Sequence, residues 1–321
     1  MTQGKPARLD PELAAILGPI AEQEIRRPPV GDIAARRRQM ERLTHLALLA
    51  PAAPGVVTSP RVVLGHDGDS VPATWYLPAA RSALGRGPSA VYLHGGGMVT
   101  GSVAMYDRVL RAYVARSAVP LLAVDYRLAP EHPHPTPVYD ALAALRAVYD
   151  DAPTLGLDRE RIAVMGDSAG GGLAAGLTHL LREQEGPAIA QQILIYPMLD
   201  DRVHPAPDHP SAAFHRWTLA DDVTGWDALL GDLRGDPDLP PWAAPSRASE
   251  LGGLPPAYLE VGDLDLFAAQ VTTYASGLLR AGVPVEFHLH RGAPHAFDLL
   301  APAASVSQRA MADRVRALRS L

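Results

Sequence analysis

The stretch that decides the fold is Ile162-Ala163-Val164-Met165-Gly166-Asp167-Ser168-Ala169-Gly170-Gly171-Gly172-Leu173-Ala174-Ala175. It begins with a short apolar run, typical of a strand buried on both faces, and ends in a run that opens a helix. Between the two lies the pattern G-x-S-x-G. In a strand–turn–helix this pattern predicts a nucleophile elbow, whose glycines permit a tight, strained turn. We therefore expect the Ser168 hydroxyl above the sheet, at a helix N-terminus that favours a developing anion.

Other interpretations of this glycine-rich loop have less support. A phosphate-binding loop would continue with G-K-[ST], which does not follow here. An incidental serine in a glycine-rich turn is the remaining structural alternative. The chain of 321 residues has no cysteine, which excludes a thiolate nucleophile, an iron–sulfur cluster and a zinc site with thiolate ligands.

Eight short apolar runs predict the strands of one sheet. They are Arg61–Leu64, Ala73–Leu77, Ala90–Leu93, Pro120–Asp125, Ile162–Met165, Gln192–Tyr196, Ala257–Val261 and Val285–Leu289. Helical stretches alternate with several of them, namely Tyr139–Tyr149, Gly170–Leu181 and Ala268–Ala281. This alternation predicts an α/β fold with a mostly parallel sheet flanked by helices. Between the first two runs, Gly65-His66-Asp67-Gly68 predicts an antiparallel hairpin.

Two segments lie outside this pattern. Residues 1–50 predict helices, because Asp10 is an expected N-cap before Pro11 and Arg36–Ala50 repeats apolar residues at helical spacing. Residues 201–247 are rich in Pro, Asp and Trp and show no strand pattern, so we expect an insertion over the sheet. The core is then expected to comprise residues 51–200 and 248–321.

A second glycine run, His94-Gly95-Gly96-Gly97, follows the expected strand Ala90–Leu93. Acyl transfer places negative charge on a carbonyl oxygen, and backbone N–H donors aimed at that oxygen stabilise it strongly. Consecutive glycines let the backbone approach closely. The expected donors are N–H groups of this run and of Ala169, directly after the serine. For His94 we expect a structural role, in which its imidazole holds the loop by hydrogen bonds.

A serine hydroxyl needs an adjacent base, and that base needs an orienting carboxylate. His295 follows the expected strand Val285–Leu289 in a turn and is the candidate base, whereas His288 and His290 are expected to be sheet residues. Asp263 and Asp265 follow the preceding strand. Because they are two residues apart, the pattern alone does not separate them as candidates for the acid.

These blocks together resemble the hormone-sensitive-lipase-like family of α/β-hydrolase esterases, in the bacterial branch with Gly-Asp-Ser-Ala-Gly at the nucleophile. The resemblance extends over roughly residues 60–300 in family order. The matching blocks are His94-Gly95-Gly96-Gly97, Asp125-Tyr126-Arg127-Leu128-Ala129-Pro130-Glu131, Gly166 to Gly171, Tyr196-Pro197-Met198-Leu199-Asp200, Val261-Gly262-Asp263-Leu264-Asp265-Leu266-Phe267 and Pro294-His295-Ala296-Phe297.

The resemblance implies site residues that the pattern left open. In the family the acid usually precedes a tyrosine by nine residues, as Asp265 precedes Tyr274. This favours Asp265 over Asp263 and implies a triad of Ser168, Asp265 and His295. The oxyanion-binding residues that carry over are Gly95, Gly96, Gly97 and Ala169, with Gly96 and Gly97 foremost.

The resemblance also implies a cap built from the N-terminal helices and from the segment after Tyr196-Pro197. One departure from the family is the stretch Ala268-Ala269-Gln270, where a charged Arg-Asp-Glu element is common. Three aromatic residues of the insertion either line an apolar substrate pocket or pack the cap onto the core. They are Phe214, Trp217 and Trp226.

The function that follows from this resemblance is hydrolysis of carboxylic esters with short-to-medium acyl chains, through an acyl-serine intermediate and without cofactor or metal. An amidase, a deacetylase or a lactone hydrolase would use the same residues. A non-enzymatic small-molecule receptor is the alternative from another class. It requires a broken triad, whereas Ser168 and His295 are both present in context.

Charge and hydropathy limit the partners. The net charge is −6 and the basic residues are scattered without interleaved aromatics, so we expect no nucleic-acid binding. The N-terminal stretch carries acidic residues where a signal peptide needs an apolar run, and no segment suits a membrane helix. We therefore expect a cytoplasmic enzyme acting on a small ester. If Val285–Leu289 is an edge strand, it favours a homodimer.

Overall fold

The computed structural model describes residues 7–21, 27–48, 53–80, 86–202 and 209–321. Within these residues the chain forms an eight-stranded sheet in the order β1-β2-β4-β3-β5-β6-β7-β8. The strands are β1 (Val56–Leu64), β2 (Ser70–Pro78), β3 (Gly87–Leu93), β4 (Leu121–Val124), β5 (Leu157–Asp167), β6 (Gln191–Ile195), β7 (Ala257–Gly262) and β8 (Val285–His290). β2 is antiparallel to both β1 and β4, and the other neighbouring pairs are parallel. The predicted mostly parallel sheet and its N-terminal hairpin are therefore confirmed.

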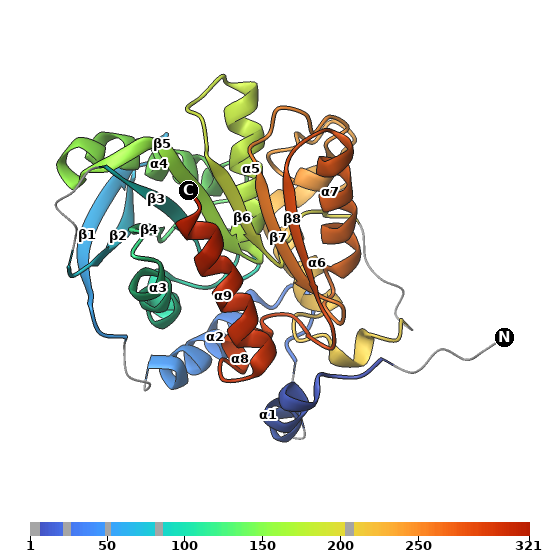
Figure 1. Ribbon diagram of the computed structural model, residues 1–321. Coiled ribbons are helices and arrows are strands. Elements are labelled where there is room, and N and C mark those ends of the chain that lie inside the picture. Colours follow the sequence, from blue (N-terminus) through green and yellow to red (C-terminus); the bar gives the residue numbers. More distant parts are fainter. Residues whose placement is uncertain (1–6, 22–26, 49–52, 81–85, 203–208) are drawn as a thin grey trace.

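Helices cover both faces of this sheet (Figure 1). They are α1 (Pro11–Ala21), α2 (Ile33–Leu48), α3 (Val103–Ser117), α4 (Thr136–Leu155), α5 (Ala169–Glu183), α6 (Leu219–Leu230), α7 (Ala268–Arg280), α8 (Phe297–Leu300) and α9 (Ser305–Arg319). α3 packs against α9 in front of the sheet, whereas α4 packs against α5 behind it. The molecule is thus an α/β structure with both sheet faces covered, as its apolar strands require.

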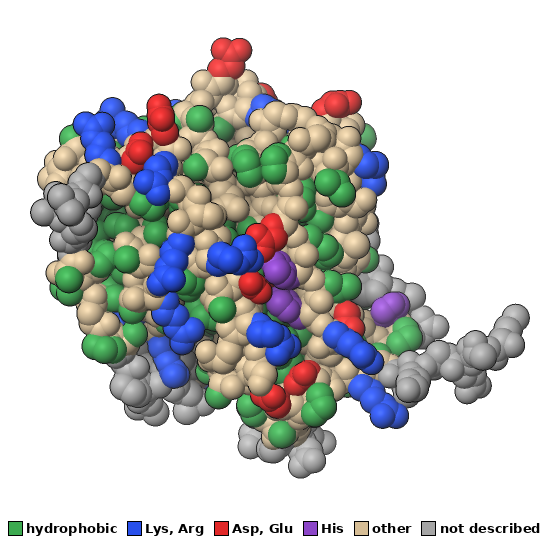
Figure 2. All heavy atoms as spheres, in the orientation of Figure 1, with side chains coloured by type: hydrophobic (Ala, Val, Ile, Leu, Met, Phe, Trp, Pro, Cys, Tyr) green, Lys and Arg blue, Asp and Glu red, His purple; other side chains and the backbone are tan. Residues whose placement is uncertain are grey.

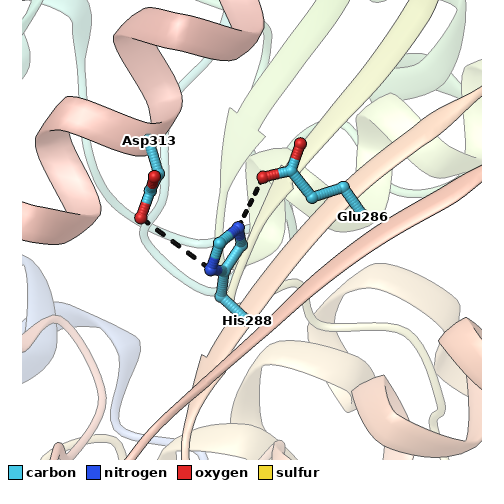
Figure 3. Close-up of side chains that lie close together, drawn as sticks. All are labelled: Glu286, His288 and Asp313. Carbon is cyan, nitrogen blue, oxygen red and sulfur yellow. Dashed lines mark hydrogen bonds and ion pairs between the residues drawn. The ribbon is translucent and has the colours of Figure 1, made fainter.

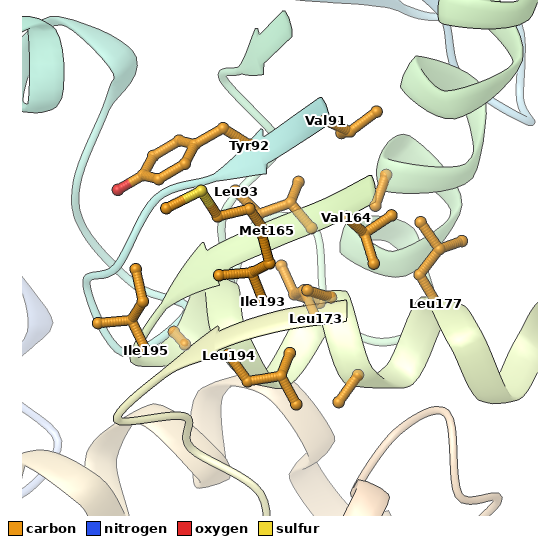
Figure 4. Packing of buried hydrophobic residues seen from close by; sticks show 14 of the residues in the cluster. Val91, Tyr92, Leu93, Val164, Met165, Leu173, Leu177, Ile193, Leu194 and Ile195 are labelled. Atoms are coloured by element: carbon orange, nitrogen blue, oxygen red, sulfur yellow. The ribbon is translucent and has the colours of Figure 1, made fainter. Parts of the chain in front are cut away.

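The centre of the core lies around three neighbouring strands. β3, β5 and β6 send apolar side chains to both sheet faces, and Figure 4 shows them packed with Leu173 and Leu177 of α5. Val91, Val164 and Ile193 are completely buried. Because β3 and β5 to β8 are all parallel, the loops after them start from the same edge of the sheet. That edge brings together the segments that carry the candidate residues.

The N-terminal helices follow the prediction closely. Asp10 Oδ1 accepts hydrogen bonds from the backbone N–H groups of Glu12 and Leu13, at 2.9 and 3.3 Å, so Asp10 caps α1. The helix predicted to begin at Arg36 corresponds to α2, which begins three residues earlier, and Ala50 lies outside the described residues.

The described part of the insertion at 201–247 contains α6 and the short 3-10 helices η1 (Ala212–Phe214), η2 (Gly231–Leu233) and η3 (Pro245–Arg247). It is bonded to the N-terminal segment. The Gly31 N–H donates to Thr224 Oγ1 at 2.9 Å, and Arg36 Nε donates to Asp221 Oδ1 at 2.9 Å. Of the two segments predicted to form a cap, residues 1–6, 22–26, 49–50 and 203–208 lie outside the described residues.

β8 is an edge strand of the sheet, which is the condition that the homodimer prediction set. Leu289 on this strand is 53% exposed. An exposed edge invites strand pairing with a second copy, so the homodimer stays a prediction. In the part of the chain that the structure describes, none of the helices has the length and apolar character needed to cross a membrane.

Candidate active site

Ser168 occupies a strained turn between β5 and α5. Its backbone has φ 54° and ψ −116°, a left-handed conformation that residues other than glycine rarely adopt and that costs about 1–3 kcal/mol. Two hydrogen bonds to the end of β6 and the loop after it hold the turn: the Ser168 N–H donates to Ile195 O, and the Met198 N–H donates to Ser168 O, both at 2.9 Å. Ala169, the first residue of α5, is completely buried. The predicted nucleophile turn is therefore formed.

The glycines on either side of Ser168 are required by close backbone contacts. A Cβ atom on Gly166 would lie 2.2 Å from the carbonyl oxygen of Gly170. A Cβ atom on Gly170 would lie 2.0 Å from the carbonyl oxygen of Leu93. No side chain fits at either position, so the G-x-S-x-G spacing is a steric requirement of the turn where β5 meets β3.

His295 and Asp265 complete a hydrogen-bonded chain that starts at Ser168. His295 Nε2 lies 3.0 Å from Ser168 Oγ, and His295 Nδ1 lies 2.8 Å from Asp265 Oδ2. The three residues are at most 5% exposed. The second carboxylate oxygen of Asp265 accepts a hydrogen bond from the Phe267 N–H at 2.9 Å, which fixes the carboxylate plane. The structure thus brings together the three residues that the resemblance implied.

Asp263, the other candidate acid, lies elsewhere. Its side chain is exposed, and its Oδ1 atom accepts a hydrogen bond from the Gly292 N–H at 2.6 Å. Gly292 belongs to the turn that leads from β8 to His295. Asp263 therefore secures the loop that carries the imidazole without contacting the imidazole itself.

The glycine run after β3 passes directly beside the nucleophile turn. A Cβ atom on Gly95 would lie 3.3 Å from the Ser168 Cβ. Gly96 and Gly97 have φ values of 133° and 60°, which few side chains tolerate. The Tyr106 hydroxyl packs beside Gly95, since a Cβ atom on Gly95 would lie 2.5 Å from Tyr106 Oη, and burial raises the pKa of Tyr106. The glycine run thus has the proximity to Ser168 that backbone donors toward a ligand at that residue need.

His94 has the structural role that was expected of it. Its Nδ1 atom lies 2.9 Å from the carbonyl oxygen of Gly95, and its ring stacks on Tyr126 with 4.3 Å between ring centroids. The Tyr126 hydroxyl in turn donates to His94 O at 2.8 Å. Burial lowers the pKa of His94, so the ring is neutral and holds the glycine loop in place.

A buried polar network lies behind the nucleophile. The Tyr92 hydroxyl donates to Asp167 Oδ1 at 2.7 Å. The Tyr196 hydroxyl lies 3.0 Å from Asp298 Oδ1 and 3.3 Å from Asp167 Oδ2. Arg314, a completely buried residue of α9, pairs with Asp298. The edge of the Tyr196 ring also packs on the His295 ring, so the network touches the candidate base.

Protonation differs between the carboxyl groups of this network. Burial raises the pKa of Asp167 to about 7, with a further increase from Asp298 and an opposing effect of Arg314. A protonated Asp167 can donate a hydrogen bond to the Tyr196 hydroxyl, which in turn donates its own proton in a hydrogen bond to Asp298. Burial would also raise the pKa of Glu260, but Arg314 outweighs it and holds that pKa at about 2. The region thus combines an ionised Arg314–Glu260 pair with a carboxyl group that titrates near neutrality.

The three aromatic residues of the insertion occupy different surroundings. Trp226 is completely buried in the core, so it packs the insertion onto the core and does not line a substrate pocket. Trp217 is partly exposed and lies on the glycine loop, since a Cβ atom on Gly97 would lie 2.2 Å from Trp217 Cζ2. Phe214, at the end of η1, is also partly exposed.

The insertion also contains a second serine–histidine pair. Ser211 Oγ lies 2.9 Å from His215 Nε2 and 2.8 Å from His209 Nδ1. The pair lacks two features of the first site. Ser211 is not at a strand–helix turn, and among the described residues no carboxylate hydrogen bond to the His215 ring is present. Ser211 is therefore a matched control for Ser168.

Among the described residues, one group could hold a metal ion: Glu286 and His288 of β8 with Asp313 of α9 (Figure 3). His288 Nε2 lies 2.6 Å from Glu286 Oε1, and its Nδ1 lies 3.8 Å from Asp313 Oδ2. Arg316 pairs with both carboxylates and lowers the pKa of Glu286 to about 2. Figure 2 shows these charge types gathered on the face over β8 and α9. Because a cation already balances the carboxylates, the cluster is an ion-pair network.

Some residues around the site were not anticipated from the sequence. Gln270, part of the departure from the family pattern, accepts hydrogen bonds through Oε1 from the N–H groups of Leu199 and Asp200, at 2.7 and 2.8 Å. It thereby ties α7 to the loop after β6. The one sequence feature that could have pointed to Gln270 is its position in the stretch that differs from the family pattern. Tyr196 opens one of the blocks that match the family, but the match gave it no role, and Arg314 carried no signal that separated it from other arginines.

The comparisons with known proteins bear on the fold and the family. A family model described as the α/β-hydrolase fold matches residues 90–299. Carboxylesterase NlhH of Mycobacterium tuberculosis is 36% identical over 263 residues, which cover 79% of this chain and 81% of that protein. The ethyl acetate hydrolase of Pseudomonas putida is 33% identical over 235 residues, covering 72% of this chain and 73% of that protein.

Solved structures give the same result. A bacterial heroin esterase superimposes with a TM-score of 0.86 at 36% identity and covers 98% of both chains. Esterase LipW of Mycobacterium marinum superimposes with a TM-score of 0.80 at 35% identity, covering 98% of this chain and 96% of that one. This chain therefore belongs to the α/β-hydrolase family, in its hormone-sensitive-lipase-like branch of carboxylic ester hydrolases.

Proposed function

We propose that Ser168 is the nucleophile of ester hydrolysis, with His295 as general base and Asp265 as the orienting acid. The observation that carries this proposal is the unbroken chain of short contacts from Ser168 Oγ through the imidazole to the Asp265 carboxylate. His295 Nε2 accepts the serine proton during attack and returns it to the leaving alcohol. Water then repeats the attack on the acyl-serine. Asp265 keeps the Nδ1–H tautomer and stabilises the imidazolium that forms.

The oxyanion of each tetrahedral intermediate is proposed to bind backbone N–H groups of Gly96, Gly97 and Ala169. Ala169 begins α5, so the partial positive charge of a helix N-terminus adds to its donor. The two glycines have positive φ values, a conformation in which their backbone can turn N–H groups toward a bound oxygen. Gly95 was also a candidate and stays the alternative donor, since it lies beside Ser168.

We propose as substrates small carboxylic esters with short-to-medium acyl chains. The segments 1–50 and 201–247 are proposed to form a cap over the site, since Trp217 of the insertion lies on Gly97. Ser168 is 5% exposed beneath this cover, which favours small soluble esters over extended chains. Amides and lactones use the same catalytic groups, so they are the second candidate substrates.

The decisive experiment combines activity with covalent labelling. Wild-type protein should hydrolyse p-nitrophenyl acetate and butyrate faster than the decanoate, and paraoxon should add one diethylphosphoryl group to Ser168. Ser168→Ala should lose activity and labelling, whereas Ser211→Ala should keep both. More than a few per cent residual activity in Ser168→Ala, or an adduct on Ser211, would contradict the assignment. Matched anilides in the same assay test the amidase alternative.

A further inference from the structure

The segment between η1 and α6 crosses the site from the acid–base pair to the glycine loop. Near its start, His215 is buried, and it is close enough to Asp265 and His295 for their charges to affect its pKa, which burial lowers. Two residues later, the six-membered ring of Trp217 lies on Gly97. The segment is therefore positioned to contact a substrate whose carbonyl group lies between these two parts.

The backbone that carries Trp217 is held in this position. The next residue, Thr218, caps α6: Thr218 Oγ1 accepts a hydrogen bond from the Asp221 N–H at 3.3 Å, and Asp221 Oδ2 accepts one from the Thr218 N–H at 2.9 Å. α6 also packs against the glycine loop, because a Cβ atom on Gly225 would lie 2.5 Å from Gly97 O. The backbone that carries Trp217 is thus fixed beside the glycine loop.

The indole N–H of Trp217 is buried and, among the described residues, has no hydrogen-bond partner. Leaving such a donor unpaired costs about 1–3 kcal/mol, so buried donors without partners are uncommon. The neighbouring ring atom Cε2 lies 3.4 Å from the Cβ position of Gly97, which places the donor beside the proposed oxyanion loop. Trp226 has a second buried N–H without a partner, but that whole side chain is completely buried in the core, whereas the Trp217 side chain is partly exposed beside the glycine loop.

We infer that Trp217 is a specificity-determining residue whose indole N–H donates a hydrogen bond to a second acceptor oxygen of the substrate. Tryptophan is a donor only, so the group that satisfies it is an ether, carbonyl or second ester oxygen a few bonds from the scissile carbonyl. The preferred substrates are then oxygen-bearing esters, not simple alkyl esters of the same size. This inference rests on the proposed function, because it assumes that the ester binds between Ser168 and the glycine loop.

The test compares esters in which one CH₂ is replaced by oxygen. On the acyl side, p-nitrophenyl methoxyacetate is paired with p-nitrophenyl butyrate; on the alcohol side, methoxyethyl butyrate is paired with butyl butyrate. Alkaline hydrolysis of each pair gives the intrinsic reactivity ratio. For at least one pair, the wild-type ratio of kcat/KM should exceed the intrinsic ratio by about three- to tenfold, the effect of one hydrogen bond. If the wild-type ratio of kcat/KM equalled the intrinsic ratio for both pairs, the inference would be overturned without the need for any variant.

Trp217→Phe removes the N–H and keeps most of the ring. In this variant the enzymatic ratio should fall to the intrinsic one, while Trp226→Phe, which also loses an unpaired N–H, should keep the wild-type ratio. An equal loss on both esters of each pair in Trp217→Phe would contradict the inference, because it would indicate packing or oxyanion contact. The Ser168→Ala result separates the two proposals: if that variant loses activity but the ratios never change, only the role of Trp217 fails.

Discussion

Asp265 Oδ2 lies 2.8 Å from His295 Nδ1, whereas Asp263, two residues earlier, holds the backbone of the loop that carries that histidine. Two carboxylates of one turn thus have separate tasks. Both tasks follow from the path of the chain after β7, which turns Asp265 inward and leaves Asp263 at the surface.

Asp265→Asn should therefore reduce kcat by roughly 10³–10⁴-fold, because an amide stabilises the wrong tautomer of His295 and cannot balance the imidazolium. Asp263→Asn should stay within a few-fold of wild type, since its amide oxygen still accepts from Gly292. Steady-state kinetics on p-nitrophenyl butyrate measure both. The opposite ranking would assign the acid to Asp263.

Gly170→Ala should destabilise the protein by about 3 kcal/mol or more, since the new methyl group would collide with the Leu93 backbone. Gly87→Ala in β3 is the matched control, because a Cβ atom there meets nothing within 4 Å. Urea denaturation followed by circular dichroism compares the two variants. Equal stability of both would mean that the turn tolerates a side chain and that its glycine is not a steric requirement.

The sequence predicted those parts of the site that depend on local geometry. Ser168 and the glycines around it lie within five residues, and the close backbone contacts of the turn require the G-x-S-x-G motif by which the turn was predicted. His295 was identifiable because it follows the last strand of the sheet in a turn. Asp265 needed the resemblance, since residues two apart on a turn differ by an orientation that spacing does not encode.

The network behind the nucleophile could not be predicted in the same way. Arg314 Nε donates to Glu260 Oε1 at 3.0 Å although 54 residues separate them. In the sequence Arg314 is one of several arginines on an amphipathic helix. Its burial depends on how α9 packs against α3 and the sheet, which is a property of the whole fold.

Asp167 should make stability depend on pH in a direction unusual for a carboxyl group. Its pKa is raised to about 7, so the folded state keeps a proton that the unfolded state loses above its ordinary pKa of 3.8. Stability therefore falls as the pH rises from about 4 to about 7. Asp167→Asn, which mimics the protonated form, should gain about 2–3 kcal/mol relative to wild type between about pH 5 and about pH 8.

Urea denaturation of both proteins at the two pH values measures this difference. The comparison cancels the contributions of other groups, including the buried histidines His134 and His179, whose lowered pKa values act in the opposite direction. A difference that stays constant with pH would show that Asp167 is ionised throughout the range.

Arg314 is the cation of the buried network, and its removal should be far more damaging than removal of a neighbouring surface arginine. Arg314→Met leaves Glu260 and Asp298 as buried carboxyl groups without their cation, which costs about 3–5 kcal/mol. Arg316, two residues further along α9, makes similar ion pairs, but its side chain is 54% exposed. Arg316→Met should therefore cost at most about 1 kcal/mol.

The activity of Arg314→Met gives a second measurement of the same network. Because Tyr196 contacts both Asp298 and the His295 ring, loss of the cation should lower kcat in the fraction that remains folded, with KM little changed. Arg316→Met should leave both constants at wild-type values. If the two arginine variants were equally stable and equally active, the buried charges would be solvated by some other means, and Arg314 would have no role in holding the site.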